Sequence, residues 1–273
     1  MTAGTSAPAR PSRDRRHDPA DDRVDERPTL LRLTLVELRK LTDTRAGYWL
    51  LITIGLVAAA IVTVILIVAP DGDQQFGNLF ALAQFPVGIL LPVLGILLVT
   101  SEFSQRTALA TFALVPRRHR VVVAKLGAGM VAALLSVLAS AATAALGTVL
   151  AGLTGEGGSW ATDPLVFVGA AVFQMVNVAL GIAFGLLFQS TPLAIVLSLV
   201  LPIAWSTLGG TIERLHRAAE WLDTGITTAA LVEPPDAGEL GAGEWARLGV
   251  SVGVWVLAPL VGGLVRTLRR EVS

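Results

Sequence analysis

Long uncharged apolar segments constrain the fold of this chain more than any other feature of its sequence. The chain is 53% hydrophobic and 15% charged, and its charges stand between the apolar segments rather than within them. About 20 helical residues, each rising about 1.5 Å, cover the roughly 30 Å hydrocarbon core of a bilayer. The segments are continuous rather than alternating, which favours helices over a barrel. We therefore expect an all-α integral membrane protein.

Six segments are long enough to cross the membrane. The predicted spans are about 48–69, 79–99, 126–153, 165–188, 192–208 and 245–265. Residues 1–28 are polar and rich in Pro, Asp and Arg, which predicts a disordered tail. Nucleic-acid binding by its arginines is the alternative, but interspersed Asp and missing aromatic residues oppose it, so we expect no nucleic-acid partner. Residues 271–273 form a short C-terminal tail.

Residues 29–45 are predicted to form an amphipathic helix just before the first span. Its leucines recur at spacings of three and four residues, with two arginines beside them. Such a helix suits the membrane interface, and an ordinary extension of the first span is the alternative. The residues that carry this pattern are Leu31, Leu35, Leu38, Leu41, Arg32 and Arg39.

The basic residues predict the orientation of the six spans. With both termini inside, 18 of the 21 Lys and Arg residues fall in cytoplasmic segments, and the external segments are acidic. The exceptions are Arg214, Arg217 and Arg247. The bias of positive charge toward the cytoplasm therefore predicts a multi-pass protein of the cell membrane with cytoplasmic N- and C-termini.

The most basic internal loop is Thr100–Lys125, which separates the second and third predicted spans. It carries four arginines and one lysine against a single acidic residue, Glu102. Ser101–Leu114 could form a helix, with Ser101 as its cap and Pro116 as its end. An apolar face on this helix could dock in a groove of a cytosolic partner. The alternative is a loop whose arginines only contact lipid headgroups.

The sequence contains no pattern for catalysis or nucleotide binding. There is no cysteine, and the three histidines are scattered, so we expect no metal site and no thiol chemistry. Neither lysine, Lys40 or Lys125, follows a glycine, which excludes a phosphate-binding loop of the P-loop type. We therefore expect no enzyme activity and no cofactor in this chain.

Few polar side chains occur inside the spans. Gln174 and Asn177 are three residues apart and share a helix face, and Gln84 lies in another span. These amides either join helices by hydrogen bonds or line a translocation path. Gly181 and Gly185 form a GxxxG pattern, which serves either packing within the chain or dimerisation.

The basic loop resembles that of the permease subunits of ABC-2 type ABC transporters. The family pattern is a Glu ending the second span, a Thr soon after, a Pro closing the segment and a Lys opening the third span. Here these are Glu102, Thr107, Pro116 and Lys125. The resemblance covers residues 29–270, including the stretch Leu38–Leu41 before the first span. Arg106 departs from the family, which often has Gly before the Thr.

The resemblance implies a permease subunit of an exporter whose cytoplasmic loop 101–125 couples to a separate ATP-binding subunit. ATP and Mg²⁺ would bind in that partner, and a second permease chain would complete the path as a homodimer or heterodimer. The external segments 211–223 and 226–232 would form short helices that cap the outer exit, or else an exposed loop on the headgroups. The implied coupling residues are Glu102, Phe103, Arg106, Thr107, Pro116, Arg117, Arg118 and Lys125.

Two other classes of function stay open on the sequence. A membrane scaffold, assembly factor or regulatory protein would recruit a cytosolic partner without a translocation path. An intramembrane enzyme is disfavoured because the spans carry no catalytic constellation. The missing charge in the spans favours an apolar or amphiphilic substrate for an exporter.

Overall fold

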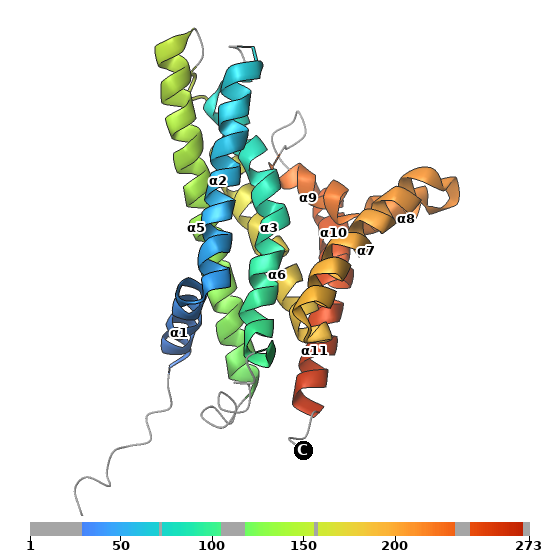
Figure 1. The fold of residues 1–273 in the computed structure, drawn as a ribbon. Coiled ribbons are helices and arrows are strands. Elements are labelled where there is room, and N and C mark those ends of the chain that lie inside the picture. The colour runs from blue at the N-terminus through green and yellow to red at the C-terminus, as the bar shows by residue number, and fades with distance from the viewer. Residues whose placement is uncertain (1–28, 71–72, 105–117, 156–157, 233–240, 270–273) are drawn as a thin grey trace, which may run out of the picture.

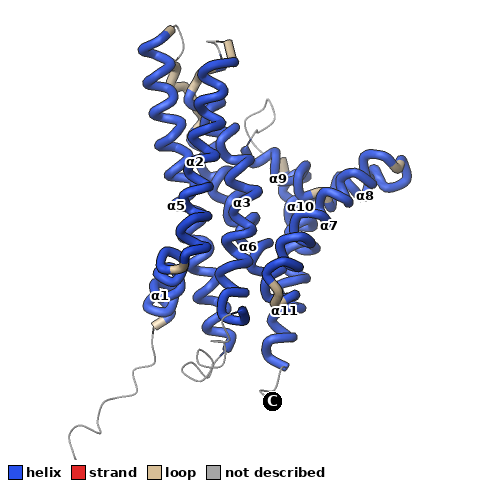
Figure 2. Tube along the Cα trace, in the orientation of Figure 1, coloured by secondary structure: helices blue, strands red, loops and turns tan. Residues whose placement is uncertain are grey.

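The computed structural model describes the chain except for residues 1–28, 71–72, 105–117, 156–157, 233–240 and 270–273. The described residues form helices joined by short loops, without strands (Figure 2). The helices are α1 (Leu30–Asp43), α2 (Arg45–Val68), α3 (Phe76–Ser104), α5 (Arg118–Thr154), α6 (Pro164–Phe188), α7 (Thr191–Thr211), α8 (Glu213–Leu222), α9 (Thr224–Val232), α10 (Ala242–Val252), the π-helical turn Gly253–Leu257 and α11 (Ala258–Arg269).

Six helical segments are long and apolar enough to cross a membrane, which confirms the predicted helical fold and is compatible with a multi-pass membrane protein. They are Arg45–Val68, Phe76–Glu102, His119–Thr154, Pro164–Phe188, Thr191–Thr211 and Ala242–Thr267. Large apolar side chains point outward along them, for example Ile67 at 77% and Ile203 at 64% exposure. Such an outer surface is suited to lipid rather than to water.

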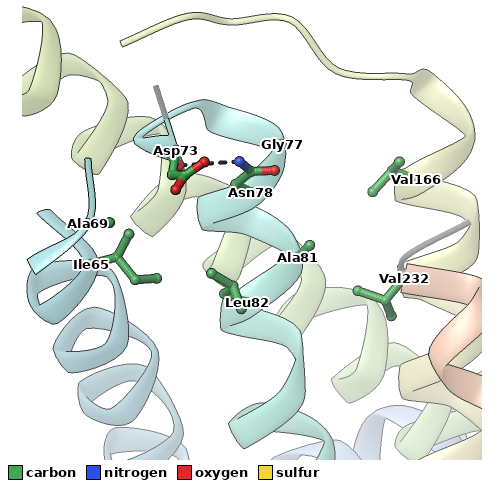
Figure 3. A pocket seen from close by; sticks show the side chains of 9 residues that line it. All are labelled: Ile65, Ala69, Asp73, Gly77, Asn78, Ala81, Leu82, Val166 and Val232. Atoms are coloured by element: carbon green, nitrogen blue, oxygen red, sulfur yellow. Dashed lines mark hydrogen bonds between the residues drawn. The ribbon is translucent and has the colours of Figure 1, made fainter. Parts of the chain in front are cut away.

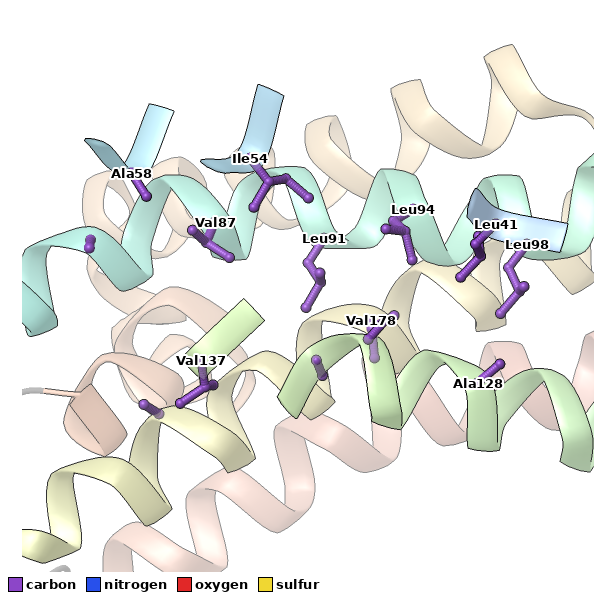
Figure 4. Close-up of a cluster of buried hydrophobic side chains, with 14 of the residues drawn as sticks. Leu41, Ile54, Ala58, Val87, Leu91, Leu94, Leu98, Ala128, Val137 and Val178 are labelled. Atoms are coloured by element: carbon purple, nitrogen blue, oxygen red, sulfur yellow. The ribbon is translucent and has the colours of Figure 1, made fainter. Parts of the chain in front are cut away.

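The helices α2, α3, α5 and α6 form the packed centre of the molecule (Figure 1). α3 and α6 make the most extensive contact, while α7 leans away and leads to α8 at the edge. The core is mostly aliphatic, with buried phenylalanines such as Phe80. Leu91 and Leu94 of α3 are fully buried and lie near Val178 of α6 (Figure 4).

Gly181 lets α3 and α6 approach closely. A methyl group on Gly181 would overlap the main-chain carbonyl oxygen of Pro92, which lies inside α3. Gly185, four residues later, faces Ile96 and Val99 of the same helix. The GxxxG pattern therefore serves packing within the chain, the first of the two alternatives that the sequence left open.

Two helix ends differ from the prediction for the basic loop. α3 continues through Ser104, so Ser101 lies inside this helix and is not the cap of a new one; that prediction was wrong. α5 already begins at Arg118 and runs for 37 residues. α3 continues past its apolar part because neither Thr100 nor Ser101 interrupts the backbone hydrogen bonds of the helix. The rest of the predicted coupling helix lies outside the described residues.

α1 coincides with the helix expected over residues 29–45. Its N-cap Thr29 accepts a hydrogen bond from the backbone N–H of Arg32 at 3.3 Å. Thr44 adopts an extended conformation and separates α1 from α2, and its own side chain caps α2. α1 is thus a distinct helix, packed on α5 near the end of the bundle where α11 also ends (Figure 1).

Candidate functional site

Four charged side chains, three of them buried, meet near the end of α3 and the start of α5, the helices that precede and follow residues 105–117. They are Glu37 and Lys40 of α1, Glu102 of α3 and Lys125 of α5, called the four-charge cluster below. Glu37, Glu102 and Lys125 are 4%, 7% and 4% exposed. Charged groups are almost never buried this deeply unless they are paired.

Lys125 is the centre of the four-charge cluster. Its Nζ lies 2.6 Å from Glu37 Oε2 and 3.2 Å from Glu102 Oε1. It also donates a hydrogen bond to the main-chain carbonyl oxygen of Leu98 at 2.8 Å. One ammonium group therefore holds α1, α3 and α5 together through three acceptors.

Lys40 closes the cluster on its outer side. Its Nζ lies 2.7 Å from Glu37 Oε1 and 2.8 Å from Glu102 Oε1. Partial burial alone would lower the pKa of Lys40, but the hydrogen bonds to Glu102 and Glu37 outweigh burial and raise the pKa above its ordinary value. Lys40 therefore stays charged at neutral pH and pairs with both Glu37 and Glu102.

The local sequence explains how α1 reaches this position. Glu37 and Lys40 are three residues apart, so they share one face of α1, and Leu41 buries beside them. Gly127 of α5 lies against Thr34, and a Cβ there would be only 3.0 Å from the Thr34 hydroxyl oxygen. The missing side chain lets α1 lie directly on α5.

A small cavity of about 130 Å³ adjoins the four-charge cluster. Glu37, Lys40, Ser101 and Thr191 contribute to its wall. Thr191, the first residue of α7, donates a hydrogen bond to the Thr100 hydroxyl at 2.7 Å. The start of a fourth helix is thus attached to the same end of α3.

The structure brings together some of the residues predicted for coupling. Glu102 and Lys125 are in direct contact, although 23 residues separate them in the sequence. Phe103 lies in the last turn of α3 and Arg118 begins α5. The remaining four, Arg106, Thr107, Pro116 and Arg117, lie outside the described residues.

Glu37 and Lys40 were not predicted as site residues. A signal was present for Lys40 alone, because the chain has only two lysines among its 21 basic residues, and both belong to the cluster. In a chain whose basic residues are nearly all arginine, a lysine indicates a position that favours a compact ammonium group over a planar guanidinium.

No protein-family model matches this chain, and no curated protein matches it. The role of the four-charge cluster is therefore argued from its own geometry. Within the part of the chain that the structure describes, no three His, Cys, Asp or Glu side chains gather as they would around a metal ion.

The amides predicted for a translocation path lie between α3 and α6. Gln84 and Gln174 are both fully buried, and Gln174 Nε2 donates to Gln84 Oε1 at 2.9 Å and to the Gln84 main-chain oxygen at 3.1 Å. Asn177 donates to the Phe173 carbonyl oxygen of its own helix at 2.9 Å. The pair joins two helices by a hydrogen bond, and a role in a path stays a prediction.

Replacing both glutamines is expected to reduce the free energy of unfolding by less than the sum of the losses in the two single variants. Gln174→Leu leaves Gln84 Oε1 without its donor, and Gln84→Leu removes one of the two acceptors of Gln174 Nε2, whereas the double variant removes both buried amides. A double-mutant cycle on thermal unfolding in detergent should give a coupling of about 1 kcal/mol. If the losses of the two single variants add up to that of the double variant, the hydrogen bond between the two glutamines contributes nothing to stability.

Proposed function

We propose that this chain is the membrane-spanning permease subunit of an ABC exporter in a bacterial cell membrane. Both termini would be cytoplasmic, and a separate ATP-binding subunit would dock on the loop 101–125. A second permease chain would complete the translocation path, and ATP and Mg²⁺ would bind in the partner. α1 would lie in the cytoplasmic interface, and α8 and α9 would cap the outer exit.

The four-charge cluster is the observation that supports this proposal. It connects α1 with the last turns of α3 and the first turns of α5, the two helices on either side of the loop 105–117. A force that a partner applies to this loop would therefore move three helices as one unit. Ion-pair networks that join rigid helices are one means by which coupling between distant sites is carried.

The distribution of charge between the two ends of the bundle also supports the proposed permease. The cluster end of the bundle carries the basic residues before α2 and at the start of α5, and the opposite end carries Asp73, Asp163 and Asp223. Positive charge prefers the cytoplasmic side, so the cluster faces the compartment that contains ATP.

Purification from the native membrane tests the proposal. The tagged chain, solubilised in detergent, should co-purify with an ATPase, and the eluate should hydrolyse ATP. Glu102→Gln should reduce the ATPase activity per copy of chain about tenfold, because a loss near 1.4 kcal/mol at the coupling contact is a factor of ten. Glu220→Gln, which changes an exposed pair with Arg247 at 3.7 Å on α8 and α10, is the matched control.

The outcome also separates the permease from a scaffold. A single-chain eluate without ATPase activity, under conditions that preserve other complexes of this kind, contradicts the permease proposal. A partner that lacks nucleotide-binding motifs would support a scaffold or regulatory protein instead. Equal elution volumes for wild type and both variants would show that the comparison is between folded proteins.

A further inference from the structure

A second cavity lies at the opposite end of the bundle from the four-charge cluster. Its volume is about 530 Å³, within the range of small-molecule sites. It is bounded by the end of α2, the start of α3, α6 and the end of α9 (Figure 3). The lining residues are Ile65, Ala69, Asp73, Gly77, Asn78, Ala81, Leu82, Val166 and Val232.

The lining has an apolar body and a polar end. Most of the wall is aliphatic, and Val232 within it is 2% exposed. Asp73 and Asn78 stand together at one end, where the Asn78 amide donates to the Asp73 main-chain oxygen at 3.3 Å (Figure 3). This hydrogen bond leaves the Asp73 carboxylate available.

Hydrogen bonds join Asp73 and its neighbour Gln74 to the end of α2. The side chain of Gln74 is buried and donates to the main-chain oxygens of Ala69 at 2.8 Å and Leu66 at 3.4 Å. The Asp73 N–H itself donates to the Pro70 oxygen at 2.9 Å. The residue that carries the carboxylate is therefore hydrogen-bonded to the end of α2 both directly and through the side chain of Gln74.

Within the described part of the chain, no basic side chain pairs with this carboxylate. Between Arg45 and Arg106 the sequence contains no Lys, Arg or His. Among the described residues, Asp73 makes no ion pair with any other part of the chain. Asp163, outside the lining, is used as the N-cap of α6, where its side chain accepts a hydrogen bond from Leu165 N at 2.8 Å.

We propose that this cavity binds a cationic amphiphile, with its apolar chain along Ile65, Ala81 and Leu82 and its amine or ammonium head at Asp73. The apolar wall removes the chain from water, and the carboxylate supplies the opposite charge at one end only. An anionic amphiphile is repelled at the same end. That the ligand is also a transported substrate rests on the proposed export function. Binding of the ligand does not depend on that function.

Saturable binding of radiolabelled dodecyltrimethylammonium tests the site. The purified chain is placed in phosphatidylcholine nanodiscs, and binding to empty nanodiscs is subtracted. Asp73→Asn keeps the shape and removes the charge, and it should weaken binding about fivefold, the equivalent of about 1 kcal/mol for a partly solvated ion pair. Glu213→Gln removes a carboxylate from α8, away from the cavity, and should leave the dissociation constant unchanged.

A second variant tests the apolar part of the cavity. Ala69→Phe fills it from the end of α2 and should abolish saturable binding, whereas Val68→Phe at the neighbouring outward position, 76% exposed, should not. Dodecanol, with the same chain and no charge, should compete equally weakly in wild type and in Asp73→Asn. Equal affinities for wild type and Asp73→Asn, or no binding above empty nanodiscs, would overturn the proposal.

The result is independent of the ATPase experiment. Binding that depends on Asp73, in a chain that recruits no ATPase, would support the ligand site and contradict the permease. Recruitment of an ATPase without binding of the ammonium probe would support the permease and remove this ligand class.

Discussion

Lys125→Met is expected to destabilise the protein by about 3–5 kcal/mol, the usual cost of removing one partner from a buried ion pair. Methionine matches the length of the lysine stem, so packing changes little. The variant leaves the buried Glu37 and Glu102, 4% and 7% exposed, without the ammonium group that they share, and it removes the hydrogen bond to the Leu98 oxygen. The midpoint of thermal unfolding in detergent measures the loss.

Lys40→Met is the matched control for this prediction. It removes the same charge from the same cluster, but the Lys40 side chain is 42% exposed, while that of Lys125 is 5% exposed. Water can approach the carboxylates on the Lys40 side, so the loss should be about 1 kcal/mol. Equal losses for the two variants would contradict the central position of Lys125.

Adding Glu37→Gln to Lys125→Met should recover part of the stability. The double variant removes one of the two carboxylates that Lys125 neutralises, so less uncompensated negative charge stays buried. A further loss on adding Glu37→Gln would show that the effect comes from packing rather than from charge.

The architecture could be predicted from the sequence because lipid imposes a simple rule. In lipid, each apolar segment must pair its own backbone N–H and C=O groups, as a helix does, so length and composition identify the six candidate spans. The positions of Ser101 and Arg118 could not be predicted in the same way. α3 and α5 continue beyond their apolar parts, and the point where a helix ends depends on contacts that apolarity does not reveal.

The site shows the same limit more strongly. Glu102 and Lys125 could be selected because the resemblance marks the two ends of the loop. Glu37 could not, because in the sequence it looks like any acidic residue on the polar face of an interfacial helix. Its burial depends on Gly127 and Thr34, which set how closely α1 approaches α5, and such a fit between two helices has no pattern in a single sequence.

Gly181→Ala is expected to reduce stability by about 3 kcal/mol, at the upper end of the usual cost of overpacking. The added methyl group would overlap the carbonyl oxygen of Pro92, which belongs to main chain and cannot rotate away. α3 and α6 would have to separate along the most extensive helix contact in the molecule. Thermal unfolding in detergent is again the measurement.

Gly210→Ala is the matched control, since it makes the same substitution inside α7. No heavy atom outside its neighbourhood lies within 4 Å of a Cβ at Gly210, so the methyl group fits without strain. Alanine is the better helix former by about 1 kcal/mol, and this variant should be as stable as wild type or slightly more stable.

The two variants also separate the two roles of the GxxxG pattern. If Gly181 and Gly185 served association between copies of the chain, Gly181→Ala would reduce the dimer fraction and leave the unfolding temperature of each copy unchanged. The close approach to Pro92 predicts the reverse result for Gly181→Ala. Its unfolding temperature should be lower, and the dimer fraction of the folded protein should be unchanged. Because Pro92 lies inside α3, this contact also fixes the position of α3, and with it the end that carries Glu102.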